Sequence, residues 1–497
     1  MTSFFDKIFT RYPIKTKRVL EIIPGFLTWT IITLPVWGSL FFPAPLAYGI
    51  LFFDVYYFYK SFQLAVTAYI GSRKIKQTES IDWMGELEKL STRETVNHIV
   101  IIPNYKERVE KLHRTLTVLS SQSYPLHNIY IILAMEEREV EANGKVKILS
   151  KEFNNKFGGI LATYHPDVPG EVKGKSSNQA FAGREAYRLL VESGKISLEN
   201  TTVTTTDADA IFDKQYFANL TYQFIIDQKR HSKFWQSAIV FYNNIWNVPS
   251  PTRVISFFGS LWRIGLLIQK DRLLTHSTYT LSFKLLKDID FWDADVIPED
   301  YRIFFKAFYR KKGNIWVEPI FLKTSMDAAL SIGYINSLKN KYHQERRWSW
   351  GVSDNPLFIK WWFTVSGVPF FRKTMLLIYV FTDHLLWPIN WFIITIFANV
   401  MPILNPVYSR TTLGYSLPRL AGFILTTTLI SLIAMIYIDY KNRPTNLKLP
   451  LHRKLLFPLE FILMPLVGFF LSALPALISH TQLMLGKRME YKVTDKV

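Results

Sequence analysis

The sequence contains no cysteine, which excludes a secreted scaffold held together by disulfides. Acidic residues are few beside basic ones, since 40 Asp and Glu against 59 Lys and Arg leave a net charge of +19. No internal repeat, low-complexity segment or nucleic-acid-binding motif is present, so nucleic acid is not an expected partner. With 49% hydrophobic and 15% aromatic residues over 497 positions, the chain is too apolar for disorder and long enough for several domains.

Long runs with few or no charges lie near both ends of the chain. Residues 22–42 carry no charge and match the roughly 20 residues of a membrane-spanning helix. This run is too long for the apolar core of a cleaved signal peptide. Further spans are predicted at 46–70, 374–399 and 420–438, while 455–480, interrupted by prolines, predicts one kinked helix or a re-entrant pair. We therefore expect five or six transmembrane helices.

Two ionisable residues, Asp54 and Lys60, lie inside the predicted second span. Charged groups at membrane depth usually face a bundle interior or a water-filled path. The alternative is that they reach the membrane surface from near a helix end. The sequence leaves both interpretations open.

Basic residues in the short loops predict the orientation of the chain. The segments 1–18 and 440–454 are rich in Lys and Arg, whereas the turn near 43–45 has none, which places the basic segments in the cytoplasm. Anionic lipid headgroups, and not nucleic acid, then account for much of the positive charge. We expect an integral protein of the plasma membrane with four parts: an N-terminal segment with two spans (1–70), a cytoplasmic domain (71–349), an interfacial amphipathic segment (350–373) and a C-terminal membrane region (374–497).

The middle of the chain alternates apolar runs of strand character with helical patterns. Continuous apolar strands separated by helices indicate an α/β domain with a Rossmann-like, mostly parallel sheet. In such sheets ligands bind beyond the carboxyl ends of the strands. The strand-like runs are 98–105, 128–135, 201–210 and 237–244.

Acidic and basic residues follow these runs. Asp207 and Asp209 end the third strand, and two carboxylates at a strand end suit a divalent cation that bridges to a diphosphate. A solvated acidic turn is the plainer interpretation. Gly174 and Lys175 open a helix, where a lysine suits an anionic group, although the loop is not a Walker A motif.

Two further motifs lie later in the domain. Pro298-Glu299-Asp300 heads an amphipathic helix, and acids at that place also cap a helix and favour its dipole. Gln344-Glu345-Arg346-Arg347-Trp348 precedes an aromatic stretch that leads to the membrane. Interfacial anchoring alone could explain its Arg and Trp.

Taken together in this order and flanked by membrane spans, the motifs resemble the membrane-embedded branch of family 2 glycosyltransferases, which includes the cellulose and hyaluronan synthases. The resemblance covers about 95–372 plus the membrane layout, and it implies a GT-A fold. The matching positions are Pro103 to Glu107, Lys175, Asp207-x-Asp209, Glu299-Asp300 and Gln344-x-x-Arg347-Trp348.

The chain departs from this family at several positions. Glu136 and Glu137 stand where paired Asp residues are common, and Pro298 replaces a Thr. Phe257-Phe258-Gly259-Ser260 looks like an acceptor motif but lies in an amphipathic run, 250–267, that we interpret as an interfacial helix. The equivalent of the acceptor strand is therefore expected at His276, Ser277 and Thr278.

The resemblance implies inverting transfer from a nucleotide-diphosphate sugar, a UDP-sugar in the first instance, to give a β-glycoside. Asp300 would be the catalytic base, supported by Glu299, and Asp207 and Asp209 would hold Mg²⁺ or Mn²⁺. The remaining implied substrate contacts are Lys175 and Arg347 to the diphosphate, Glu107 and Glu136 to the nucleoside, and His276, Ser277, Thr278, Gln344 and Trp348 to the acceptor. For Glu107, a role in the fold of the first loop is the alternative. Plain packing is the alternative for Trp348.

The acceptor stays open. A growing polysaccharide could be exported along Asp54, Asp383, His384, Trp387 and Trp391, which the resemblance favours. A polyprenyl-phosphate or glycolipid acceptor would instead receive a single sugar, with the helices docking the lipid. A non-catalytic membrane scaffold or transporter is the third hypothesis, because a fold does not fix a function.

Overall fold

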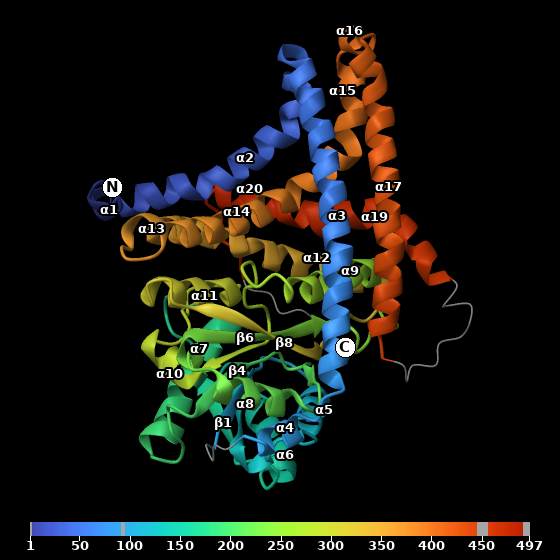
Figure 1. Ribbon diagram of the computed structural model, residues 1–497. Coiled ribbons are helices and arrows are strands. Elements are labelled where there is room, and N and C mark those ends of the chain that lie inside the picture. Colours follow the sequence, from blue (N-terminus) through green and yellow to red (C-terminus); the bar gives the residue numbers. More distant parts are fainter. Residues whose placement is uncertain (1, 91–94, 445–455, 491–497) are drawn as a thin grey trace.

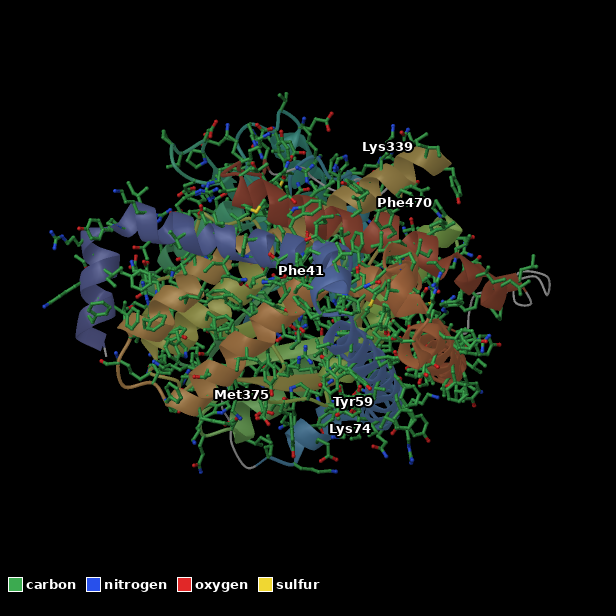
Figure 2. All side chains as sticks on the ribbon, turned by 90° about the horizontal axis from the view of Figure 1, so that it is seen from above. Phe41, Tyr59, Lys74, Lys339, Met375 and Phe470 are labelled. Atoms are coloured by element: carbon green, nitrogen blue, oxygen red, sulfur yellow. The ribbon has the colours of Figure 1, made fainter. Side chains whose placement is uncertain are left out.

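The computed structural model describes residues 2–90, 95–444 and 456–490. Figure 1 shows a sheet domain at one end and a group of long helices at the other, with α9, α11 and α12 between them. Seen from the helical end, Tyr59 and Lys74 of α3 lie on one side of the molecule, and Lys339 and Phe470 lie on the opposite side (Figure 2).

The sheet has eight strands in the order β3-β2-β1-β4-β7-β6-β8-β5. Strands β3, β2, β1 and β4 are mutually parallel, and β6 is parallel to β8, but β7 is antiparallel to both of its neighbours and β5 to β8. The prediction of a mostly parallel sheet holds for six of the eight strands, which run in one direction, while the short β7 and β5 run against them and make the sheet mixed. The strands are β1 (Asn97–Pro103), β2 (Ile129–Glu136), β3 (Gly159–His165), β4 (Thr201–Thr205), β5 (Ile211–Phe212), β6 (Lys233–Val240), β7 (Tyr279–Ser282) and β8 (Trp316–Ser325).

Helices cover both faces of this sheet. Alternate residues of β1 belong to separate buried clusters, Ile99 and Ile101 to one and Val100 and Ile102 to the other, as expected when successive side chains of a strand point to opposite faces. One face packs against α5 (Val109–Leu119), α6 (Ala142–Phe153) and α8 (Tyr216–Ile226), and the other against α7 (Lys175–Ala186), α10 (Phe283–Asp288) and α11 (Glu299–Arg310). A strand buried on both faces explains the continuous apolar runs in the sequence.

Four stretches of helix are long and apolar enough to cross a membrane, among the described residues: Pro13–Phe41, Phe370–Leu404, Thr412–Asn442 and Phe457–Met484. The expected five or six spans are therefore not confirmed. The predicted span 46–70 lies in α3, a continuous helix of 37 residues that is not among the four, because Asp54, Lys60 and several tyrosines lower its hydropathy. The basic segment 440–454 lies mostly outside the described residues.

The helical region lies against one end of the sheet domain (Figure 1). Helix α3 packs along α17 and continues down to α9 and β8, so it joins the two parts of the molecule. The predicted interfacial run at 250–267 forms α9 (Ser250–Leu266), and 350–373 contains α13 (Asn355–Thr364). The other elements are α1 (Thr2–Arg11), α2 (Pro13–Phe41), α3 (Pro43–Glu79), α4 (Trp83–Glu88), α12 (Tyr334–Ser349), η4 (Trp350–Asp354), α14 (Phe370–Phe392), η5 (Ile393–Phe397), α15 (Ala398–Leu404), α16 (Pro406–Ser409), α17 (Thr412–Asn442), η6 (Phe457–Leu463), α19 (Met464–Gly468), η7 (Phe469–Ala473) and α20 (Leu474–Met484).

Candidate active site

A single cavity of about 1110 Å³ runs from the ends of the strands into the helical region. It collects most of the side chains that the sequence singled out, while Thr278 is fully buried and bonds Thr206 instead of lining it. The predicted residues that line the cavity are Glu107, Glu136, Lys175, Asp207, Asp209, His276, Ser277, Glu299, Asp300, Gln344, Arg347 and Trp348.

Ser277 connects the predicted metal ligand with the predicted base. Its hydroxyl donates to Oδ2 of Asp207 at 2.9 Å, and its backbone N–H donates to Oδ2 of Asp300 at 2.9 Å. The backbone at Ser277 has φ +53°, a left-handed conformation that costs a non-glycine residue free energy and is held only by its surroundings. The residue just before β7 therefore links the end of β4 to the start of α11.

Lys175 occupies the centre of this group at the start of α7. Its Nζ donates to the backbone carbonyl of Ser277 at 2.7 Å and lies 3.0 Å from Asp207 and 3.1 Å from Glu299. Burial alone would lower the pKa of Lys175, but the charges of Asp207, Glu299 and Asp300 outweigh burial and hold the pKa well above its usual value. Lys175 is thus a permanent cation at the strand ends. The helix begins there because Gly174, with φ +147°, makes a turn that other residues rarely adopt.

Asp300 is buried in a position that favours its protonated form. Burial and the adjacent charge of Glu299 raise the pKa of Asp300 well above its usual value, and Lys175 lowers it only in part. Its Oδ2 accepts the Ser277 N–H, while Oδ1 has no hydrogen-bond partner among the described residues and the side chain lines the cavity. A carboxylate with an elevated pKa and an available oxygen is suited to accept a proton from a bound hydroxyl.

The two aspartates after β4 are held differently. Asp209 is buried and accepts the backbone N–H of Asp327 at its Oδ2, 2.7 Å away. Asp207 is 30% exposed in its side chain and faces Lys175 and Ser277. Their carboxylate oxygens are the donor type that Mg²⁺ and Mn²⁺ prefer, so the pair fits such an ion. Within the described part of the chain no group of three or more acidic or histidine side chains could hold a metal alone.

Two glutamates line the end of the cavity next to β1 and β2. Glu107 forms an ion pair with Lys111 at 2.8 Å, and Glu136 accepts from Nε of Arg138 at 2.5 Å. The guanidinium of Arg138 stacks on the ring of Tyr105, 3.9 Å from its centroid. Both acids are thus paired with cations, which leaves the nucleoside-binding role predicted for them as a prediction.

Trp348 is surrounded by cations that sequence reasoning missed. Nζ of Lys341 lies 4.5 Å from the ring centroid of Trp348, and the guanidinium of Arg263 lies 5.5 Å from it. Lys341 also pairs with Glu345 at 2.7 Å and donates to Oε1 of Gln344 at 2.9 Å. Trp348 therefore does not offer two open faces to a sugar. Lys341 precedes Gln344 by one helical turn, so the sequence carried a signal for the contact between these two residues. Nothing in the sequence relates Arg263 to Trp348.

His276 lies near the same end of the cavity and is neutral. Burial and the charge of Arg263 lower the pKa of His276 to about 3, and its Nε2 lies 3.2 Å from the hydroxyl of Tyr301. The neutral imidazole has one nitrogen that donates and one that accepts, so it can form hydrogen bonds of either direction with hydroxyl groups.

The cavity continues between the long helices. Asp383, His384, Trp387 and Trp391 line it, as the prediction of a path through the helices requires. Asp54 does not line it and is buried at 1% exposure. The prediction that Asp54 faces this path is therefore wrong, because the residue points into the packing of α3 with its neighbours.

Comparison with known proteins identifies no family. No known family profile and no curated protein matches the chain, so the resemblance to the cellulose and hyaluronan synthase branch is not confirmed. Similar solved structures include the mannosyltransferase PcManGT from Pyrobaculum calidifontis in complex with GDP-Man and Mn²⁺, at 13% identity and a TM-score of 0.41, covering 77% of this chain and 100% of that one. S. aureus TarS 1-349 in complex with UDP has 11% identity and a TM-score of 0.38, covering 81% and 95%. Scores at this level assign no function by themselves.

Proposed function

We propose that the protein is an inverting membrane glycosyltransferase that takes a sugar from a nucleotide diphosphate, a UDP-sugar in the first instance, and forms a β-glycosidic bond. The observation that supports this most is the contact of Ser277 with both Asp207 and Asp300. It brings a proton acceptor and a carboxylate suited to a diphosphate-bound cation to the same end of one cavity.

The reaction is a single displacement at the anomeric carbon. The acceptor hydroxyl forms the new C–O bond, the bond from that carbon to the diphosphate oxygen breaks, and the bonding electron pair leaves with the nucleoside diphosphate. Asp300 takes the hydroxyl proton as the new bond forms. Glu299 lies beside Asp300 and forms an ion pair with Lys175, and the charges of both groups act on the pKa of Asp300. The elevated pKa of Asp300 makes it a better base than an exposed carboxylate.

The departing diphosphate needs positive charge. Lys175 and Arg347 line the cavity and would donate to its oxygens, the latter as a fork. Asp207 and Asp209 would hold Mg²⁺ or Mn²⁺, which offsets negative charge on the leaving group. Two carboxylates are fewer ligands than such an ion takes, so the diphosphate would supply further ligand oxygens.

Two acceptors are compatible with a base in this position. The sequence resemblance favours a growing glycan that is exported as a polysaccharide, and a lipid-linked sugar that receives one residue is the alternative. The two acceptors differ in what would fill the membrane end of the cavity: a glycan chain in the first case and the hydrocarbon of a lipid in the second.

The test is release of nucleoside diphosphate by the purified protein in nanodiscs, across a panel of UDP- and GDP-sugars with Mg²⁺ or Mn²⁺. Asp300→Asn is expected to lower turnover by about 10² to 10⁴-fold while calorimetry still detects donor binding. Asp290→Asn is the matched control, since Asp290 is 68% exposed in its side chain and has the positive φ that Asn tolerates. Unchanged turnover in Asp300→Asn would contradict the proposal and favour a non-catalytic scaffold or transporter.

A further inference from the structure

The membrane end of the cavity has two walls of different chemistry. Helix α3 and helix α14 supply polar and aromatic groups, among them Lys60, Asp383 and Asn390. The second wall is mainly aliphatic, and Thr428 is its one hydroxyl among the described lining residues of α17, η6 and α19. The aliphatic residues are Leu425, Leu429, Leu432 and Met435 of α17 with Ile462 and Met464.

This aliphatic wall continues onto the outer surface of the helices. Leu429 and Ile462 both line the cavity, yet they are 51% and 75% exposed. Ile430 and Ile433 follow on the outer face of α17, where they are 67% and 69% exposed. Since Thr412–Asn442 is apolar enough to cross a membrane, the cavity opens sideways between α17 and η6 toward hydrocarbon.

A cluster of charges lies at the same depth on the wall that α3 and α14 supply. Arg272 forms an ion pair with Asp383, and Nζ of Lys60 donates to Oε1 of Gln63 at 2.8 Å, so two cations accompany one carboxylate. Nδ2 of Asn442 donates to the Ser72 hydroxyl at 2.7 Å, and α3 and α17 run in the same direction (Figure 1). Lys60 lies 72 − 60 = 12 residues before Ser72, and Ile430 lies 442 − 430 = 12 before Asn442, so the lysine is level with the lateral opening.

The charge cluster is also close to the catalytic base. Burial raises the pKa of Tyr301, and the charges of Asp383, Arg263 and Arg272 also act on it. Tyr301 follows Asp300 directly and lines the cavity with it. Tyr301, Arg272 and Asp383 therefore line the same cavity as the carboxylate that would take the acceptor proton.

We propose that the acceptor is a sugar linked through phosphate to a membrane lipid, which enters between α17 and η6, lays its hydrocarbon on the aliphatic wall and binds its phosphate at Lys60 and Arg272. This inference rests on the proposed glycosyltransferase function. The headgroup sugar then reaches Asp300 with the hydroxyl that receives the new glycosidic bond.

The two walls suit this ligand better than a glycan chain. A glycan carries hydroxyls on all sides, and those facing Leu425, Leu429 and Leu432 would lose their hydrogen bonds to water, at a cost in free energy for each. A hydrocarbon chain loses nothing on that wall and gains contact with it. The excess cation among Lys60, Arg272 and Asp383 matches a phosphate and no group of a neutral glycan.

The binding experiment uses the full-length protein in phosphatidylcholine vesicles that contain a polyprenyl phosphate with a diazirine in its hydrocarbon chain. After irradiation, peptide mapping is expected to find label on 425–435 and 461–468. An excess of unlabelled polyprenyl phosphate should reduce this label, whereas the same excess of phosphatidylcholine should not. Label that is confined to Ile430 and Ile433 on the outer face, or that resists competition, would overturn the inference.

Two variants examine the opening and the cation separately. Lys60→Gln removes a charge whose hydrogen bond is to the neutral Gln63. It is expected to lower about tenfold the labelling that unlabelled polyprenyl phosphate competes away. Leu429→Trp narrows the opening and should lower labelling without changing the charge. Lys339→Gln is the control, because Lys339 is an exposed lysine of α12 on the opposite side of the molecule from Tyr59 and Lys74 of α3 (Figure 2). Wild-type labelling in both test variants would refute the assignment.

Product analysis distinguishes this inference from the proposed function. Native membranes supplied with radiolabelled donor should yield label that partitions into chloroform–methanol, and Lys60→Gln should lower that yield about tenfold. Ethanol-insoluble polymer formed at the same rate by Lys60→Gln would retain the transferase and reject the lipid acceptor. Absence of both donor binding and turnover would reject the transferase itself, and the labelling experiment would then decide the lipid site alone.

Discussion

The hydroxyl of Ser277 donates a hydrogen bond to Asp207 while its own backbone N–H is bonded to Asp300. One residue thus fixes the separation of the proposed metal ligand from the proposed base. The backbone carbonyl of Ser277 also accepts a hydrogen bond from Lys175. The donor and acceptor parts of the reaction are therefore coupled by a short piece of chain before β7, and a shift of this segment would move both.

We expect Ser277→Ala to lower kcat by about 10 to 100-fold, because a hydrogen bond to a charged group contributes about 1.5 to 3 kcal/mol. The backbone contact to Asp300 survives in this variant, so the fold should persist. Steady-state kinetics with circular dichroism measures both quantities. Ser193→Ala on the exposed surface is the control, and equal kcat values in the two variants would show that the Asp207 contact is unimportant.

The pH dependence of turnover should follow Asp300. As a base it acts only when deprotonated, and its pKa lies well above the usual 3.8, so kcat should rise with pH as Asp300 loses its proton. Lys175→Met removes the charge that lowers this pKa, and the acidic limb should then move to higher pH. Lys173→Met, an exposed lysine of the same loop, should leave the midpoint unchanged. A shift to lower pH in Lys175→Met would contradict the assignment.

The two aspartates after β4 should respond differently to replacement by asparagine. Asp207→Asn removes the more exposed carboxylate, and the Mg²⁺ or Mn²⁺ concentration needed for half-maximal turnover should rise at least about tenfold, as for loss of a metal contact. Asp209→Asn should lower thermal stability as well, because buried Asp209 accepts the backbone N–H of Asp327. Metal titration and melting curves in detergent separate the two effects, and identical profiles would argue against separate roles.

The buried pair of Lys341 and Glu345 predicts strong coupling. Their side chains are 2% and 6% exposed at a separation of 2.7 Å, and removing one partner leaves an uncompensated charge at a cost of about 3 to 5 kcal/mol. Lys341→Met should therefore be markedly destabilised, and adding Glu345→Leu should recover most of the loss. Thermal unfolding of both single variants and the double variant measures this, and additive losses would exclude coupling.

Local signals in the sequence predicted the ends of elements well. Helices begin at Lys175 and Glu299 as expected, because Gly174 and Pro298 precede them. Strands buried on both faces appear as continuous apolar runs, so Asp207 could be placed at a strand end. These features depend on neighbours in the chain, which a sequence displays directly.

Features that depend on distant contacts were not predictable. The four-residue β7 is too short to show its direction in the sequence, so an antiparallel strand within the sheet was not expected. Arg263 and Trp348 are 348 − 263 = 85 positions apart, and only the packing of α9 against α12 brings the cation to the ring. The continuation of α3 to Glu79 was also missed, because the predicted span ended at residue 70, where the apolar run gives way to polar residues.

The cavity is built by two regions of the chain, with one end at the ends of the strands and the other between α3, α14 and α17. Under the proposed function, which sugar is transferred and what receives it would therefore be determined by different residues. Either preference can drift during evolution, or be altered by an engineer, without disturbing the other. A chimera that keeps residues 95–349 and exchanges the surrounding helices would be a way to redirect the same sugar to a new recipient.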